Sequence, residues 1–248
     1  MPNVTMIIIN ADDWGRSTGD TDATVRCYEQ KRITSVSAMV FMQDSERAAE
    51  LAREKGMDVG LHLNFTERFT GNIPSPLMRE YQDRTRRFLT RTKYSVLLYN
   101  PTLREQFRYL YQAQSEEFCR LYRAEPSHVD GHQHMHLCAN MLFARIIPSG
   151  ERVRRSFSFW PGEKSALNRT YRHFVDAWLA RRYRLTDFFF ALSQTLEGER
   201  RKRVIELAKT AKVELMTHPR EVKEYNYLLS DACLEMLRHL EVGSYSLV

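Results

Sequence analysis

The stretch Val4-Thr5-Met6-Ile7-Ile8-Ile9-Asn10, which continues as Ala11-Asp12-Asp13-Trp14-Gly15, decides the fold. Its first half is short, apolar and rich in β-branched residues, a pattern that predicts a buried strand. Two carboxylates follow that run directly. Adjacent carboxylates are costly to place together unless they share a cation or a proton, although an Asp at this point can also cap the next helix. Asp12 and Asp13 are therefore candidate functional groups at the end of the first strand.

The segments downstream alternate between strand-like and helix-like patterns. Helices are predicted over 20–31 and 45–55, and strands over 34–41 and 58–64. Further on, the pattern predicts helices over 101–122, 167–183, 198–209 and 228–240, and strands over 153–159 and 213–217. This alternation is typical of parallel βα units, so the expected fold class is α/β, as a barrel or an open doubly wound sheet. In both folds the catalytic groups lie at the carboxyl ends of the strands.

A single domain over 1–248 is expected, with an insertion around 66–100. Pro74, Pro76 and several arginines interrupt the βα rhythm in that segment. A stretch of this kind predicts a lid over one face of the domain, or a contact between copies of the chain in a homo-oligomer.

The composition narrows the class of protein. With 43% hydrophobic residues, the chain of 248 residues can bury a core, which excludes disorder of the whole chain. Its 37 basic and 31 acidic residues give a net charge of +6. Acidic residues are interspersed among the arginines. We therefore expect the arginines to lie on a solvated surface, or at the entrance of an active site that attracts anions, and we expect no nucleic-acid partner.

Targeting signals are not expected in this chain. The first apolar run stops at Asn10, too short for a signal peptide, and the apolar run at 188–192 is far below the roughly 20 residues that span a bilayer. The cysteines form no C-x-x-C pair; they are Cys27, Cys119, Cys138 and Cys233. We therefore expect a cytoplasmic protein without a membrane span.

Half of the eight histidines fall in one segment, His128-Val129-Asp130-Gly131-His132-Gln133-His134-Met135-His136. Every even position there is His or Asp, and on an extended chain those side chains share one face. Their spacing of about 6.6 Å lets one ion contact about two of them, so the others orient ligands or contact substrate.

Two more histidines stand at the ends of predicted strands. One is in Gly60-Leu61-His62-Leu63-Asn64 and the other in Thr217-His218-Pro219. Each is also compatible with a core or turn histidine when taken alone. Together with the Asp pair and the histidine-rich segment, they place carboxylates and imidazoles at four strand ends, which is the usual make-up of a catalytic divalent-metal site. Such a site favours hydrolysis.

At these residues the sequence resembles the ChbG/HpnK (YdjC-like) carbohydrate deacetylase family. The matching motifs span the chain in family order: Asn10-Ala11-Asp12-Asp13-x-Gly15, Gly60-Leu61-His62, His128-Val129-Asp130-x-His132-x-His134-x-His136, Thr217-His218-Pro219 and Gly243-Ser244-Tyr245. The resemblance implies a distorted (β/α) barrel of the polysaccharide-deacetylase-like type. It also implies metal-dependent removal of an acetyl group from an N-acetylated sugar or oligosaccharide.

The resemblance further implies roles for single residues. Asp13, His62 and His132 would be the metal ligands, with Mg²⁺ or Zn²⁺ as the cofactor. Asp12 would be the general base and His218 the candidate general acid. Four further residues are expected to contact the substrate, with the two arginines near the developing oxyanion: Asp130, His134, Arg154 and Arg155.

Two other functions are compatible with the same residues. A metal-dependent phosphoesterase would use a similar Asp/His site, and the arginines would attract its anionic substrate. A basic protein that binds polysaccharide or nucleic acid, with a purely structural metal, is the second.

Overall fold

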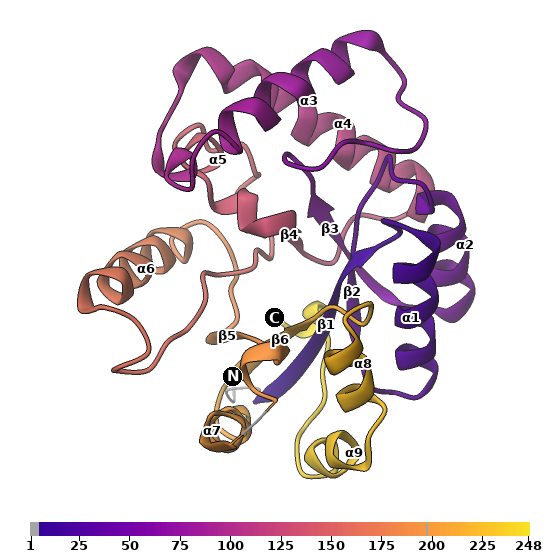
Figure 1. Cartoon of the computed structure of the whole chain (residues 1–248), viewed down its shortest axis with the longest axis vertical. Coiled ribbons are helices and arrows are strands. Elements are labelled where there is room, and N and C mark those ends of the chain that lie inside the picture. The colour runs from indigo at the N-terminus through magenta and orange to yellow at the C-terminus, as the bar shows by residue number, and fades with distance from the viewer. Residues whose placement is uncertain (1–4, 197) are drawn as a thin grey trace. The chain divides into compact units, whose positions relative to one another are not determined.

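The computed structural model describes residues 5–196 and 198–248, and within them the strands form one six-stranded sheet in the order β4-β3-β2-β1-β6-β5 (Figure 1). The strands are β1 (Met6–Trp14), β2 (Ser35–Ala38), β3 (Asp58–Leu63), β4 (Val129–Gly131), β5 (Phe188–Ala191) and β6 (Lys212–Thr217). The pairs β1/β6, β5/β6 and β3/β4 are parallel. The predicted α/β class is confirmed. Val4, where the first strand was predicted to begin, lies outside the described residues.

Helices connect the strands, as parallel pairing requires. They are α1 (Thr18–Glu29), α2 (Ser45–Lys55), α3 (Pro76–Leu89), α4 (Arg104–Tyr122), α5 (Ala139–Phe143), α6 (Ala166–Leu179), α7 (Gly198–Ala208), α8 (Val222–Leu228) and α9 (Asp231–Arg238). Helix α2 ends at Gly56, whose φ of 62° closes the helix in the left-handed conformation that glycine adopts readily. Helix α3 lies within the predicted insertion and begins at Pro76, with Ser75 capping the Met78 amide.

The chain divides into two compact units. The first contains the chain through Asp12, Asp22–Val36 and Gly150–Val248, and the second contains Asp13–Thr21 and Ser37–Ser149.

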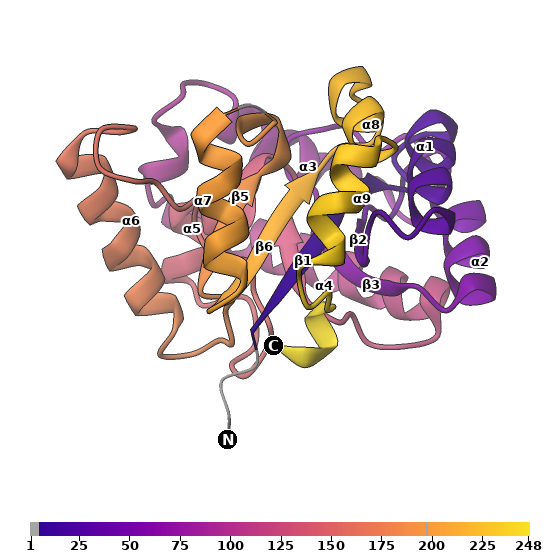
Figure 2. The same ribbon diagram turned by 90° about the horizontal axis from the view of Figure 1, so that it is seen from below.

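In the first unit, β6 pairs with both β1 and β5, and α7 packs against β6 (Figure 2). The β1 residues Met6 and Ile8 form a buried cluster with Tyr245. A second buried cluster joins Phe189 of β5 to Met216 of β6, with the ring of Phe157 against it.

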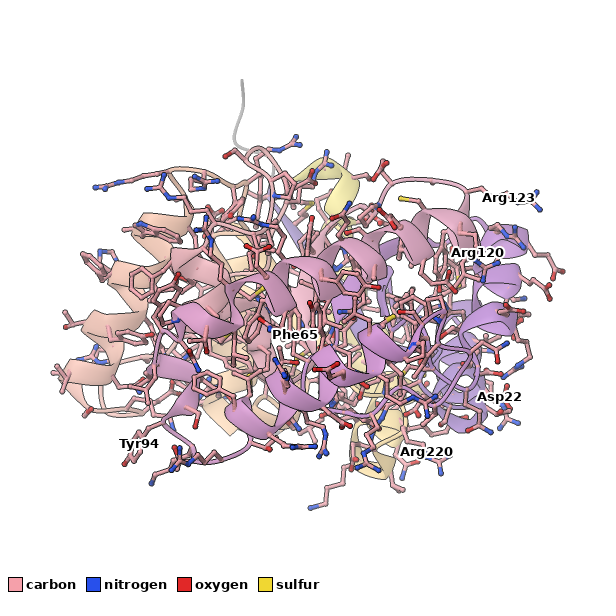
Figure 3. The ribbon with its side chains drawn as sticks, turned by 90° about the horizontal axis from the view of Figure 1, so that it is seen from above. Asp22, Phe65, Tyr94, Arg120, Arg123 and Arg220 are labelled. Carbon is pink, nitrogen blue, oxygen red and sulfur yellow. The ribbon has the colours of Figure 1, made fainter. Side chains whose placement is uncertain are left out.

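In the second unit, β3 and β4 pair so that His62 lies opposite Asp130. Helix α4 packs against β3, α2 and α3. Helices α3 and α4 run side by side (Figure 1). The ring of Phe65, labelled in Figure 3, lies 5.1 Å from the ring of Phe107 on α4. This packing fixes β3, and with it His62, on a buried support.

One expected strand is absent, and the extended histidine-rich segment is shorter than its alternating pattern predicted. The segment 153–159 does not form a strand; an isolated bridge pairs the preceding Arg152 with Arg184. The segment 128–136 is extended only through Gly131, because Gln133 and His134 adopt left-handed backbone angles, with φ of 53° and 60°. The chain therefore turns into a short 3₁₀ segment at His132–Leu137 instead of continuing along one face.

Among residues 5–196 and 198–248, no helix combines the length and the apolar character needed to cross a lipid bilayer.

Candidate active site

Three of the predicted groups meet in the second unit. Asp13 stands near the end of β1, His62 in β3, and His132 directly after β4. Asp13 Oδ1 lies 3.4 Å from Nε2 of His62 and 2.9 Å from Nδ1 of His132. The three side chains are buried or nearly so, with exposed fractions of 7%, 2% and 12%.

The spacing of these three groups fits a divalent metal ion. One donor atom from each lies within 4.8 Å of the others. Metal–ligand bonds of about 2.0–2.2 Å in a tetrahedral site put neighbouring donors roughly 3.3 Å apart, close to the separations from Asp13 to the two imidazoles. One carboxylate and two imidazoles leave positions open for water and substrate.

The charge balance of the cluster favours a cation. Burial opposes ionisation of Asp13, but hydrogen bonds and charges from His132 and His62 outweigh it and hold the pKa of this carboxyl well below its ordinary value. Burial likewise disfavours protonation of His132, yet hydrogen bonds to Asp13 and Glu67 raise its pKa. The His132 hydrogen bond, with the charge of Arg16, lowers the pKa of Glu67 against the opposing effect of burial. The carboxylates thus stay ionised and attract positive charge.

Asp130 fixes the orientation of His62. Its Oδ1 lies 2.7 Å from Nδ1 of His62, so the imidazole can donate Nδ1–H to Asp130, and Nε2, 3.4 Å from Asp13, is the nitrogen that would bind an ion. Ser37 Oγ donates to the other oxygen of Asp130 at 2.8 Å and lies 3.0 Å from Nε2 of His128. Asp130, Ser37 and His128 have no exposed surface. The result is a buried hydrogen-bond network behind one proposed ligand.

Local backbone features hold this network in place. Asp13 has a φ of 63°, a conformation that non-glycine residues adopt rarely and that often marks functional sites. Gly60 leaves room for the neighbouring His128 ring, since a Cβ at position 60 would overlap that ring. This explains the glycine in Gly60-Leu61-His62.

Asp12 belongs to the first unit and has a different environment. Its two carboxylate oxygens accept hydrogen bonds of 2.7 Å from both terminal nitrogens of Arg154. Arg154 also donates Nε–H to Glu214 Oε1 at 2.7 Å, and the other Glu214 oxygen accepts a hydrogen bond from the Tyr245 hydroxyl. Arg154, Glu214 and Tyr245 are fully buried, so each charge depends on the next for its compensation.

His218 follows β6 in the same unit as Asp12 and is partly buried. Its backbone N–H donates to Glu224 Oε2, which also accepts a hydrogen bond from Thr217, both at 2.7 Å. The buried Glu224 carboxylate thus anchors the turn that carries His218.

The remaining predicted site residues lie in varied surroundings. Asp130 and Arg154 are buried against protein groups, a placement that favours positioning over direct contact with a sugar. Arg155 pairs with Asp176 at 2.7 Å. His134 lies on the 3₁₀ segment, with its ring 6.4 Å from the ring of His136.

Several residues of these networks were not predicted from the sequence, among them Glu214, Glu67, Ser37 and Glu224. Glu214 is a charged residue inside the apolar strand β6, and an acidic residue in a buried strand is a readable signal of a paired charge. Glu67 lies 3.3 Å from Nε2 of His132. It stands in a loop, where no sequence periodicity or motif marks it as functional. Ser37 is too common a residue in strands to attract notice.

The parallel sheet and the Asp13, His62 and His132 cluster define an α/β protein with a candidate catalytic metal site. The sequence model of the family described as YdjC-like protein matches residues 6–239, so the chain belongs to the YdjC-like family.

Several curated proteins are similar in sequence. A chitooligosaccharide deacetylase of Proteus mirabilis is 30% identical over 144 residues, which cover 58% of this chain and 53% of that protein. A carbohydrate deacetylase of mouse is 34% identical over 53% of this chain and 43% of its own length. The chain thus aligns with about half the length of these relatives. A carbohydrate deacetylase of Vibrio campbellii is 28% identical over 95% of this chain and 86% of its own length.

Solved structures confirm the fold. An Enterococcus faecalis protein described as a candidate cellobiose-phosphate cleavage protein superposes with a TM-score of 0.64 at 18% identity, over 96% of this chain and 97% of its own. The Xyl-CE4 domain of a xylanase from the hindgut metagenome of Trinervitermes trinervoides gives a TM-score of 0.51 at 9% identity, over 98% and 88% of the two chains. The predicted polysaccharide-deacetylase-like fold is confirmed.

Proposed function

We propose that this protein is a metal-dependent hydrolase that removes the acetyl group from an N-acetylated sugar. The observation that carries the proposal is the cluster of Asp13, His62 and His132, whose donor atoms lie within 4.8 Å of one another. Membership in the YdjC-like family, with curated relatives named carbohydrate or chitooligosaccharide deacetylases, supports the choice of reaction and substrate class.

Asp13, His62 and His132 would hold the ion. Two imidazoles and one carboxylate suit Zn²⁺, and Mg²⁺ is the alternative with a greater preference for oxygen ligands. A divalent ion bound there makes water more acidic and polarises a carbonyl oxygen. Asp130 supports this role by keeping Nε2 of His62 available as a donor to the ion.

Asp12 is the proposed general base. It precedes Asp13 in the chain, so the two Cα atoms are about 3.8 Å apart across one peptide bond. It takes a proton from the water whose oxygen attacks the acetamide carbonyl carbon. Arg154 occupies one face of the Asp12 carboxylate with two hydrogen bonds and fixes its orientation. Arg154 is thus proposed as a positioning residue.

His218 is the proposed general acid. The C–N bond breaks with its electron pair on nitrogen, and the departing amine needs a proton to leave as a sugar amine. An imidazole is suited to give one, and His218 lies in the same unit as Asp12, at the end of the strand paired with β1. The products are acetate and a deacetylated sugar.

The test separates ligands from the base. Acetate release from N-acetylated mono- and oligosaccharides is measured together with metal content for the variants Asp12→Asn, His132→Ala and His218→Ala. Asp12→Asn should retain the metal and lose turnover, whereas His132→Ala should lose both. His218→Ala should slow turnover by roughly 10²–10⁴. Hydrolysis of phosphate esters without acetate release would instead support a phosphoesterase.

A further inference from the structure

A small cationic pocket lies in the first unit. Arg155, which was expected to contact the substrate, lines it, whereas the groups assigned to the proposed reaction do not. Its volume is about 170 Å³, room for several non-hydrogen atoms since one water takes about 30 Å³. Its charged lining is Arg155, Arg169, Arg172, His173 and Asp176. The three arginines and the one aspartate together carry a net charge of +2.

Among the residues that the structure describes, the only carboxylate in the pocket lining is that of Asp176, and it already accepts hydrogen bonds from protein groups. Asp176 Oδ2 accepts hydrogen bonds of 2.7 Å and 3.1 Å from Arg155, and its Oδ1 accepts from the backbone N–H of Ser156. Asp176 and Arg155 therefore neutralise each other. The charges of Arg169 and Arg172 remain.

These two arginines have hydrogen-bond donors to spare. Arg169, Arg172 and His173 stand at i, i+3 and i+4 on α6, so they share one helix face although like charges repel there. Nε of Arg169 is buried and finds no acceptor within the described chain. Arg172 donates Nε–H to Asn168 at 2.9 Å and makes no ion pair with a described residue, while burial lowers its pKa below the ordinary value. A bound anion would offset the repulsion between the two arginines, accept the hydrogen bond that Nε of Arg169 lacks, and compensate the buried charge of Arg172.

Aromatic rings form the rest of the pocket wall. Phe157, Phe159 and Phe188 line it, and three cations surround the ring of Phe159: Arg172 at 5.1 Å, Lys164 at 5.3 Å and Arg200 at 5.7 Å from its centre. Guanidinium groups bind phosphate with paired hydrogen bonds, and the rings offer an apolar face to whatever carries it.

We propose that this pocket binds the phosphate group of a phosphate ester, with Arg169 and Arg172 on the oxyanion and the phenylalanine rings against the attached organic group. The inference does not rest on the deacetylase reaction. Leu167 and Phe174, 81% and 71% exposed on the same helix, allow the ester to come from a lipid headgroup as well as from a soluble molecule.

Calorimetric titration with phenyl phosphate, with phenol as the neutral control, tests the site. The wild-type protein should bind phenyl phosphate, and Arg169→Gln/Arg172→Gln should weaken binding by about tenfold or more. Arg181→Gln, an exposed arginine just beyond α6, should have no effect. Equal affinity in the wild type and the double variant overturns the proposal. So does loss of binding in His132→Ala alone, which would place the phosphate at the Asp13 cluster.

Arginine labelling of the wild-type protein gives a readout that needs no variant. Phenyl phosphate should protect Arg169 and Arg172, but not Arg181, from phenylglyoxal, as seen by peptide mass spectrometry. Absence of protection contradicts the site. Vesicles of phosphatidylcholine and phosphatidylglycerol, sedimented with each protein, identify the source of the ester: retention that the double variant loses indicates a lipid headgroup, and binding of phenyl phosphate alone indicates a soluble ester.

Discussion

Nδ1 of His62 lies 2.7 Å from Oδ1 of Asp130, and the opposite nitrogen of the same imidazole faces Asp13 at 3.4 Å. The hydrogen bond from Nδ1 to Asp130 determines whether Nε2 is available to bind a metal ion. A ring that donates Nδ1–H to a buried carboxylate keeps a lone pair on Nε2, the form in which histidine binds metals. The proposed metal site thus extends beyond its ligands into the core of the second unit.

Replacement of this carboxylate should weaken the site. Asp130→Asn keeps the shape but removes the charge that orients His62, and we expect metal affinity to fall by about 10–100-fold. Competition with a chromophoric chelator measures it. Asp83→Asn, on the surface helix α3, is the matched control and should bind metal as the wild type does. Wild-type affinity in Asp130→Asn would contradict the role given to this residue.

Arg154 should be a large contributor to stability. Arg154→Met leaves Asp12 and Glu214 buried without their shared cation, and the free energy of unfolding should fall by about 3–5 kcal/mol. Urea denaturation followed by circular dichroism measures the change. Arg120→Gln removes an exposed arginine that is also paired twice and should cost less than about 1 kcal/mol. Similar losses in both variants would refute the account.

Tyr245 should act on stability through one hydroxyl. Tyr245→Phe retains the ring in its cluster with Met6 and Ile8 but removes one hydrogen-bond donor from the buried Glu214 carboxylate. The free energy of unfolding should fall by about 1–3 kcal/mol. Tyr94→Phe, whose side chain is exposed and labelled in Figure 3, serves as the control. An unchanged unfolding midpoint in Tyr245→Phe would show that Glu214 does not depend on this hydroxyl.

Stabilisation by metal should grow with pH. The pKa of His132 is raised in the metal-free protein, so its contribution to stability is present below the ordinary pKa of about 6.5 and is lost as pH rises through the raised value. The lowered pKa of Asp13 contributes at every pH above about 4. Protons therefore compete with metal at His132, and the rise in Tm on adding Zn²⁺ should be small at pH 5.5 and larger at pH 8. An equal rise at both pH values would argue against His132 as a ligand.

Periodicity and strand ends were enough to predict the α/β fold and a cluster of carboxylates and imidazoles at the strand ends, because parallel strands bring their carboxyl ends to one edge of a sheet. The choice of Asp13, His62 and His132 among these residues came from the resemblance to the family. The extent of the segment 128–136 was not predictable in this way. Its left-handed residues Gln133 and His134 carry no glycine signal, so an extended chain was the simpler expectation.

The partners behind the site were harder to predict than the site itself. Arg154 and Glu214 are 60 residues apart in sequence, and only the fold brings them together. Asp130 was expected to contact the substrate, and its burial and its hydrogen bond to His62 favour a positioning role. The alternation of His and Asp does not distinguish a residue that faces a ligand from one that faces the core, because burial is a property of the tertiary structure.

The most direct test of the central claim is acetate release from a panel of N-acetylated mono- and oligosaccharides, with protein stripped by a chelator and then given Zn²⁺ or Mg²⁺. The stripped protein should be inactive, one of the two metals should restore acetate release, and His62→Ala should stay inactive with either. Acetate release that is the same in stripped, restored and His62→Ala protein would contradict a metal-dependent deacetylase.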